Sequence, residues 1–231
     1  MRRSCAATLL VITALFAASA RATAAPTSST GGNVEPALDT VAPNTVAVVA
    51  SGAPVQGVVP VIVRNGTGHN VTVRRIRAAA VDGSGHTTAR ASTRTVVPSV
   101  LAPNGLGLAR VNFQDPAMPA SVTYEFDVTS MRARKPRTVA LEPTSFELSP
   151  PSTGPVAQTL DVTLRNPTTS AVRGPAGIAV MCFGEARRPS VLIATTSRID
   201  RTAPGASVRA RVGLRELCPS YLVAATAIRA T

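Results

Sequence analysis

The stretch VIVRNGTGHNVTVRR, residues 61–75, has a counterpart about one hundred residues later, VTLRNPTTSAVRGP at residues 162–175. Both run from alternating apolar residues into Arg-Asn, then into a polar turn that contains threonine, then into valine. Other matches keep the same order and nearly the same spacing: Ala102-Pro103 with Ala203-Pro204, ARVNF at 109–113 with ARVGL at 210–214, and Tyr124 with Tyr221. Matches that recur in one order at one period indicate that the chain contains an internal duplication.

Within each copy, apolar residues alternate with polar ones, which is the period of a half-buried β-strand. Clear examples are SVTYEFDVTS at 121–130, QTLDVTLRN at 158–166 and SVRARVGL at 207–214. Turn signals separate these segments: NGTG at 65–68, DGSG at 82–85, APNG at 102–105 and APG at 203–205. Six or seven short strands in roughly 95 residues are typical of an immunoglobulin-like fold. We therefore expect an all-β chain with two tandem immunoglobulin-like β-sandwich domains.

Residues 1–24 are expected to be a secretory signal peptide. Arg2 and Arg3 precede an apolar run from Ala6 to Ala20, and A-x-A cleavage sites follow at Ala22 and Ala24. The run is short for a membrane span, although an uncleaved anchor is an open alternative.

The remaining boundaries follow from the repeat. Residues 25–40 are polar and without periodicity, so we expect a flexible leader. Immunoglobulin-like domain 1 then covers residues 41–136 and domain 2 covers residues 137–231. Only a few residues separate the last strand of one copy from the first strand of the next, so we expect the two domains to be closely coupled.

The chain after the signal peptide has no second apolar run of membrane-spanning length, so it has no predicted transmembrane segment. We expect it to be secreted or associated with the cell envelope. Removing Arg2, Arg3 and Arg21 leaves 21 basic and 12 acidic residues, a net charge of +9. Lys135 is the only lysine, a bias typical of proteins from GC-rich bacterial genomes, so an excess of arginine alone says little about function.

Two cysteines, Cys182 and Cys218, follow the signal peptide. In an exported protein such a pair indicates one disulfide. The 36-residue separation corresponds to a stabilisation of about 3–4 kcal/mol in the chain-entropy model. In the alignment of the copies Cys182 matches Val81 and Cys218 roughly matches Ser121, so the first copy lacks the pair.

The densest polar cluster is DGSGHTT at 82–88. Asp82, Ser84 and His86 suggest a nucleophile and base, but a triad needs side chains that converge from separate elements beside an oxyanion hole. Turn residues that cap their own backbone explain the cluster better, with catalysis and weak calcium binding as minor alternatives. The other histidine, His69, is in the same copy and both remaining cysteines are in the other, so copper and zinc sites lack ligands. We expect no catalytic residue, no metal site and no cofactor.

Asn65 and Asn70 begin formal glycosylation sequons, N-G-T and N-V-T. Asn166, the counterpart of Asn65, is followed by proline and begins none. This difference favours a turn-forming role for Asn65.

These pieces together resemble the FxLYD-type immunoglobulin-like domains of bacterial exported proteins. The matching segments are VRNGT (63–67), AAAVDGSG (78–85), LAPNG (101–105) and Tyr124 in copy 1, and LRNPT (164–168), AVMCFGEA (179–186), TAPG (202–205) and Tyr221 in copy 2. The eponymous motif is replaced by AAAVD in copy 1, and copy 2 has Phe183 where the motif has aspartate. The resemblance implies an immunoglobulin-like fold and an extracytoplasmic setting, and it supplies no catalytic residues.

The arginines that occur only in the second copy, Arg187, Arg188, Arg198 and Arg201, are the candidate anion-binding surface, with an ordinary solvated face as the alternative. We do not expect nucleic acid as a partner, because no aromatic residues are interleaved with these arginines.

The sequence thus predicts a non-catalytic, exported, envelope-associated binding or accessory protein. Its expected partner is an envelope protein or an acidic envelope polymer. The alternative is a structural or scaffold protein that assembles with envelope proteins through its sheet edges. An enzyme ranks third.

Overall fold

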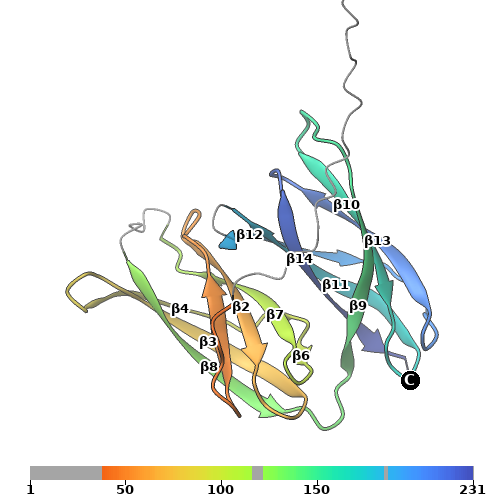
Figure 1. Cartoon of the computed structure of the whole chain (residues 1–231), viewed down its shortest axis with the longest axis horizontal. Coiled ribbons are helices and arrows are strands. Elements are labelled where there is room, and N and C mark those ends of the chain that lie inside the picture. The colour runs from red at the N-terminus through yellow and green to blue at the C-terminus, as the bar shows by residue number, and fades with distance from the viewer. Residues whose placement is uncertain (1–37, 116–121, 185–186, 231) are drawn as a thin grey trace, which may run out of the picture.

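The computed structural model describes residues 38–115, 122–184 and 187–230, and it shows an all-β chain (Figure 1). The strands form several antiparallel sheets, and no α-helix occurs in these ranges. The predicted signal peptide, and all of the predicted leader except residues 38–40, lie outside the described residues.

We call residues 38–132 the first half. Its strands are β1 (Val46–Ser51), β2 (Val58–Asn65), β3 (Val71–Val81), β4 (Thr87–Thr93), β5 (Val96–Val97), β6 (Val100–Leu101), β7 (Leu106–Asn112) and β8 (Thr123–Arg132). One sheet has the order β1-β2-β7-β5, and in the other β3 pairs with β8 along one edge and with β4 and β6 along the opposite edge. A buried cluster joins the two sheets, with Val61 of β2 and Ile76 of β3 both fully covered.

We call residues 138–230 the second half. Its strands are β9 (Thr138–Leu148), β10 (Gln158–Arg165), β11 (Val172–Phe183), β12 (Pro189–Ser197), β13 (Ser207–Leu214) and β14 (Ser220–Arg229). The strand order is β12-β11-β14-β9-β10-β13. The first residues of β9, up to Leu141, pair with β14, and the residues from Glu142 onward pair with β10. A second buried cluster contains Leu160 of β10, Ile178 of β11 and Val212 of β13.

Every strand pair that the structure describes joins two strands of the same half. Five strands of each half correspond one to one in their order along the chain and in their pairing. In chain order, β2, β3, β4, β7 and β8 correspond to β10, β11, β12, β13 and β14. The predicted alternation is confirmed in β10, where Leu160, Val162 and Leu164 are buried and the residues between them are partly exposed. The duplicated sequence therefore corresponds to a duplicated arrangement of strands.

Two strands differ from the expected half-buried pattern. In β2 the residues from Val59 to Val63 are all buried, and in β11 so are those from Ile178 to Phe183. Both sequences are continuous apolar runs, which indicate burial on both faces of a sheet.

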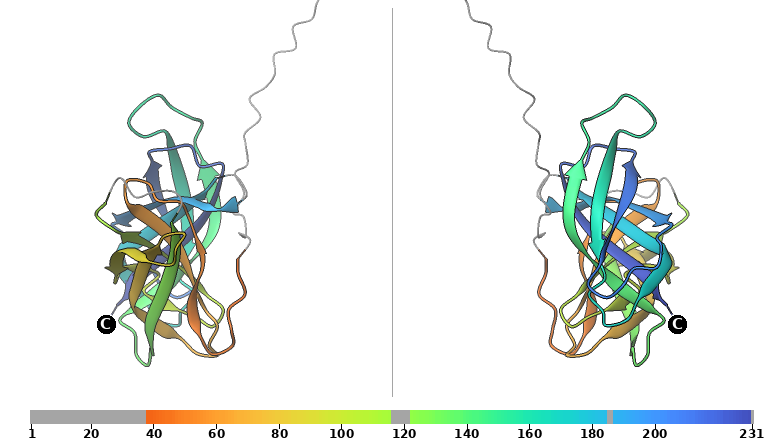
Figure 2. Two further views of the ribbon diagram at one scale, coloured as in Figure 1. Left: turned by 90° about the vertical axis from the view of Figure 1, so that its left-hand side faces the viewer. Right: turned by 90° about the vertical axis from the view of Figure 1, so that its right-hand side faces the viewer.

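The second face of β2 and of β11 is buried in a third apolar cluster, which joins the two halves. Its members are Val49, Ile62, Leu108, Ala179, Met181, Phe183 and Ala224. The five-residue connection 133–137 brings the halves side by side (Figures 1 and 2). At the contact, a Cβ atom on Gly52 would lie 2.1 Å from the carbonyl oxygen of Pro189, so only glycine fits there. The hydroxyl groups of Ser99 and Thr138 also form a 2.6 Å hydrogen bond. The two halves thus share a close-packed apolar contact.

The structure corrects one pair in the alignment of the copies. Tyr124 lies opposite Ala80 on β3, and Tyr221 lies opposite Cys182 on β11, so Cys182 corresponds to Ala80 and not to Val81. The reason is a longer irregularity in β11, between Arg173 and Gly177, than the one-residue bulge that interrupts β3. Ser121, the predicted match of Cys218, lies outside the described residues.

Candidate functional site

The repeated Arg-Asn corner is built around a buried amide. Asn65 is fully covered, and its Nδ2 donates to the carbonyl oxygens of His69, Leu101 and Ala102 at 2.9, 3.1 and 2.9 Å. Its Oδ1 accepts from the backbone N–H and the hydroxyl of Thr67 at 2.9 and 2.7 Å. One side chain thereby joins the end of β2 to the turn before β7.

The second copy repeats this network. The buried Asn166 donates to the carbonyl oxygens of Ser170, Thr202 and Ala203, and it accepts from the backbone and hydroxyl of Thr168. Both asparagines also make the same backbone hydrogen bonds to the following turn, through Asn104 and Gly105 in one copy and Gly205 and Ala206 in the other. The Asn-x-Thr sequence is therefore a structural corner, and the Asn65 amide is not accessible for glycosylation in the folded chain.

The predicted disulfide is confirmed. Cys182 in β11 is bonded to Cys218, which lies just before β14, and both side chains are buried. The N–H of Cys218 donates to the Oε1 atom of Gln158 at 3.1 Å. The bridge thus fixes the loop before β14 to the core of the second half and leaves no free thiol there.

The Asp82 loop forms hydrogen bonds within itself. The hydroxyl of Ser84 lies 2.6 Å from Asp82 Oδ1 and 2.9 Å from His86 Nδ1, and Asp82 also accepts from the backbone N–H groups of Ser84 and His86. These hydrogen bonds, with that from the Ser84 hydroxyl as the largest cause, hold the pKa of Asp82 below its ordinary value. Ser84 and His86 are exposed and Asp82 is half-buried, and the carboxylate contacts serine rather than orienting the imidazole ring. This geometry is that of a capped turn.

The four predicted anion-binding arginines fall into two separate pairs. Arg187 and Arg188 precede β12, while Arg198 and Arg201 follow it, and all four are exposed. The nine residues of β12 place roughly 30 Å between the two pairs, so they do not converge on one anion.

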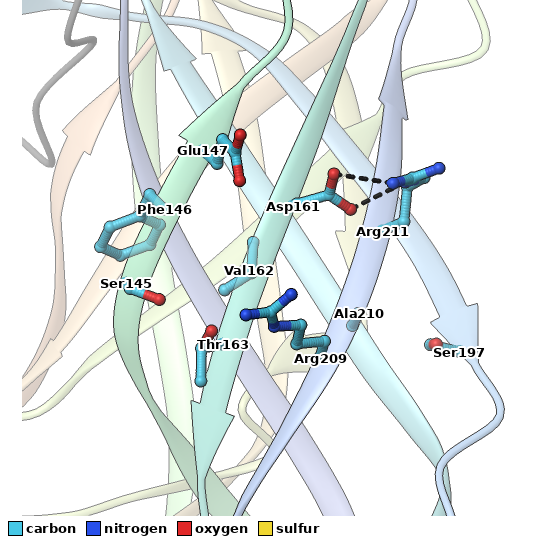
Figure 3. Close-up of a pocket in the computed structure, with 10 residues that line it drawn as sticks. All are labelled: Ser145, Phe146, Glu147, Asp161, Val162, Thr163, Ser197, Arg209, Ala210 and Arg211. Atoms are coloured by element: carbon cyan, nitrogen blue, oxygen red, sulfur yellow. Dashed lines mark hydrogen bonds and ion pairs between the residues drawn. The ribbon is translucent and has the colours of Figure 1, made fainter.

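A shallow depression of about 840 Å³ lies on the outward side of β9, β10 and β13 (Figure 3). Arg211 Nε and Nη2 donate to the two carboxylate oxygens of Asp161 at 2.7 and 2.9 Å, and Glu147 and Arg209 lie beside this ion pair (Figure 3). The hydrogen bond from Arg211 is the main cause that lowers the pKa of Asp161. The charges at the depression are balanced, with two acids, Glu147 and Asp161, and two arginines, Arg209 and Arg211.

A different set of arginines does converge, on the outward side of β3, β4 and β8. We call this surface the basic face; its charged residues are Arg74, Arg75, Arg77, Arg90, Arg94, Glu125 and Asp127. Arg77 pairs with Asp127, which lies opposite it on β8, at 3.3 Å. No ion pair at 4 Å or less involves the other four arginines among the described residues.

The prediction from sequence missed this cluster because its members come from three strands. Arg74, Arg75 and Arg77 lie close together in the sequence, and this run was one available signal. The bulge at Arg74 adds an extra residue to this part of β3.

Among the described residues, no group of three or more His, Cys, Asp or Glu side chains could hold a metal ion. Nor does any helix in that part of the chain have the length and apolarity needed to cross a membrane.

No family model matches the sequence, and no curated protein matches it. Among solved structures, a transglutaminase from red sea bream matches with 14% sequence identity and a TM-score of 0.23. The match covers 83% of this chain and 32% of the transglutaminase chain, so this protein spans about a third of that length. A likeness at this TM-score carries no argument about fold or activity.

Proposed function

We propose that the chain consists of two tandem immunoglobulin-like β-sandwich domains of the FxLYD type, residues 41–136 and 137–231. We further propose that it is an exported, envelope-associated binding or accessory protein without catalytic activity. Its partner is an acidic envelope polymer or an envelope protein.

The apolar cluster shared by the two halves is the observation that carries this proposal. Met181 and Phe183 of β11 are buried against Ile62 and Leu108 of the first half, which fixes two rigid sheets relative to each other. A fixed pair of sheets with charged outward faces suits the display of a binding surface. The buried disulfide supports an oxidising compartment, and the Asp82 loop supports a structural role for the polar residues found there.

The test measures how much of the protein is retained by isolated cell envelopes. The secreted full chain is incubated with envelopes, and the bound fraction is measured as salt is raised. Loss of the bound fraction at high salt supports an acidic polymer, while salt-insensitive capture of one protein supports a protein partner. Hydrolysis of envelope substrates that disappears in Ser84→Ala or His86→Ala would show that the protein is an enzyme.

A scaffold that assembles through sheet edges is the second candidate, and one difference between the halves favours it. The first residues of β9 pair with β14, whereas no described strand pairs with the corresponding outer edge of β8. An open edge can accept a strand from another chain. Concentration-dependent self-association that is abolished by Val128→Pro, but not by the same substitution in a loop, would support this candidate.

A further inference from the structure

We propose that the basic face binds the oxyanion groups, phosphate or carboxylate, of a linear acidic polymer. This inference rests on the proposed binding function and assigns it to one surface of the first half. It places the anion site on β3, β4 and β8 and not at the four arginines that sequence alone suggested.

The main evidence is a pair of like charges, Arg75 and Arg94, that line one depression. Ile76 of β3 lies opposite Thr93, the last residue of β4, and Arg75 and Arg94 are the residues next to this pair along the chain. Both line the same depression of about 580 Å³. Arginines gathered in one depression repel each other, so this arrangement is one that a bound anion would relieve.

Within the described ranges, no carboxylate forms an ion pair with Arg75 or Arg94. Opposite Arg75 on β8 is Thr129, and the nearest acid along that strand, Asp127, is engaged by Arg77. Thr72 and Thr129 line the depression together with Arg74, so hydroxyl donors accompany the guanidinium groups. A planar guanidinium can bind two oxygens of one phosphate or carboxylate, which a balanced ion-pair surface cannot offer.

The face extends beyond one anion. A second depression of about 780 Å³ adjoins the first at Arg77 and reaches Arg90. Arg90 and Arg94 are four residues apart on an extended segment, or roughly 13 Å. That span suits several charges along a polymer rather than a single small ion.

The side chains also argue against nucleic acid as this polymer. Phe126, the aromatic residue of β8 closest to the face, packs toward the core of the first half, and Phe113 lies against Tyr124. Both phenylalanines line the second depression, whereas no aromatic residue in the part of the chain that the structure describes lines the first, so the surface around Arg75 and Arg94 has no platform on which bases could stack.

The test uses the full-length secreted chain and a double variant, Arg75→Ser with Arg94→Ser. The matched control is Arg187→Ser with Arg188→Ser, which removes the same charge at the start of β12. A third variant, Arg75→Lys with Arg94→Lys, keeps the charge but loses the planar fork. Binding of fluorescent inorganic polyphosphate and of poly-glutamate is measured separately by anisotropy at fixed salt, and thermal unfolding confirms that each variant is folded.

We expect the Arg75/Arg94 serine variant to bind the preferred probe about tenfold more weakly, the lysine variant to fall between it and the wild type, and the control to lose less than about twofold. Preference for polyphosphate or poly-glutamate identifies the oxyanion. Equal losses in the serine variant and the control, or no binding of either probe by the wild type, would overturn the site.

Envelope retention separates the two proposals. If envelopes retain the Arg75/Arg94 serine variant as well as the wild type, the assignment of the anion site to the basic face is wrong, and the proposed binding function still stands. If the wild type binds polyphosphate through this face but is not retained by envelopes, the face is supported and the envelope function fails.

Discussion

The same sheet face has opposite characters in the two halves. On β3 and β8, Arg77 faces Asp127, and the equivalent positions on β11 and β14 are Ala179 and Ala224. Two residues further along β3, Ala79 lies between Arg90 and Glu125. At the equivalent position of β11, Met181 lies between Leu192 and Leu222. The first face is open to solvent, while the second is buried against the other half. The two copies therefore share the apolar character of the inward residues and differ in the outward ones.

The opposite sheets show the reverse pattern. In the first half the outward side of β2 and β7 carries Ile62 and Leu108, which are buried at the contact. In the second half the outward side of β10 and β13 carries Asp161 and Arg211, which form the ion pair of Figure 3. One apolar face from each half is used in the contact, and one charged face from each half stays available.

The largest expected effect comes from placing a charge in the contact. Met181→Asp would bury an unpaired carboxylate at a fully covered position, which should lower the free energy of unfolding by about 4 kcal/mol or more. Urea denaturation measures the change. The matched control is Ala79→Asp, at the equivalent position of the basic face, where neighbouring arginines should keep the change within about 0.5 kcal/mol. Similar losses at both positions would mean that the two faces are not distinct.

The next effect tests the half that has the disulfide. Replacing both Cys182 and Cys218 with alanine should cost about 3–4 kcal/mol, because the bridge closes a loop across 36 residues of the unfolded chain. Chemical denaturation with and without reductant gives the measurement. Reductant should destabilise the wild type by a similar amount and leave the variant unchanged; a wild type that is indifferent to reductant would contradict the prediction.

The duplicated corner should behave alike in both halves. Asn65→Ala and Asn166→Ala each remove a buried amide that donates to three carbonyl groups, so each should cost about 2–3 kcal/mol. Equilibrium unfolding of the two variants is compared directly. A cost confined to one copy would show that the corner supports only that half.

The smallest effect concerns the charged face of the second half. Arg211 lowers the pKa of Asp161 below its ordinary value of 3.8, so the stabilisation is present above that pH and is lost as the pH falls through the lower folded-state value. Because the pair is exposed, its contribution should be less than about 1 kcal/mol. Asp161→Asn should therefore be slightly less stable than the wild type at pH 7 and converge with it in strong acid. A constant difference across that range would rule out the ion pair as the cause.

Much of the strand pattern could be predicted because inward residues obey a period of two. Leu160, Val162 and Leu164 alternate with polar residues, and the repeated Asn-x-Thr corner marks the same turn twice. The disulfide followed from the even number of cysteines in a chain expected to be exported. The alignment within β11 was wrong by one residue, since the extra residue of its irregularity has no distinct sequence signal.

The contact between the halves and the basic face depend on distant residues. The run of apolar residues in β11 indicates that both sides of the strand are buried, but not that Ile62 covers one of them. Arg75 and Arg94 are 19 positions apart, and only the pairing of β3 with β4 brings them together. Selecting the arginines that occur only in the second copy instead chose residues at opposite ends of β12.

The shared apolar contact also bears on the order in which the protein is made. The first half is complete at Arg132, yet Ala224, one of the residues that covers Ile62 and Leu108, is added 92 residues later. Until the residues of β11 and β14 that belong to this cluster have been added, the apolar face of the first half has no partner. The first half therefore carries an aggregation-prone apolar surface until both β11 and β14 are in place.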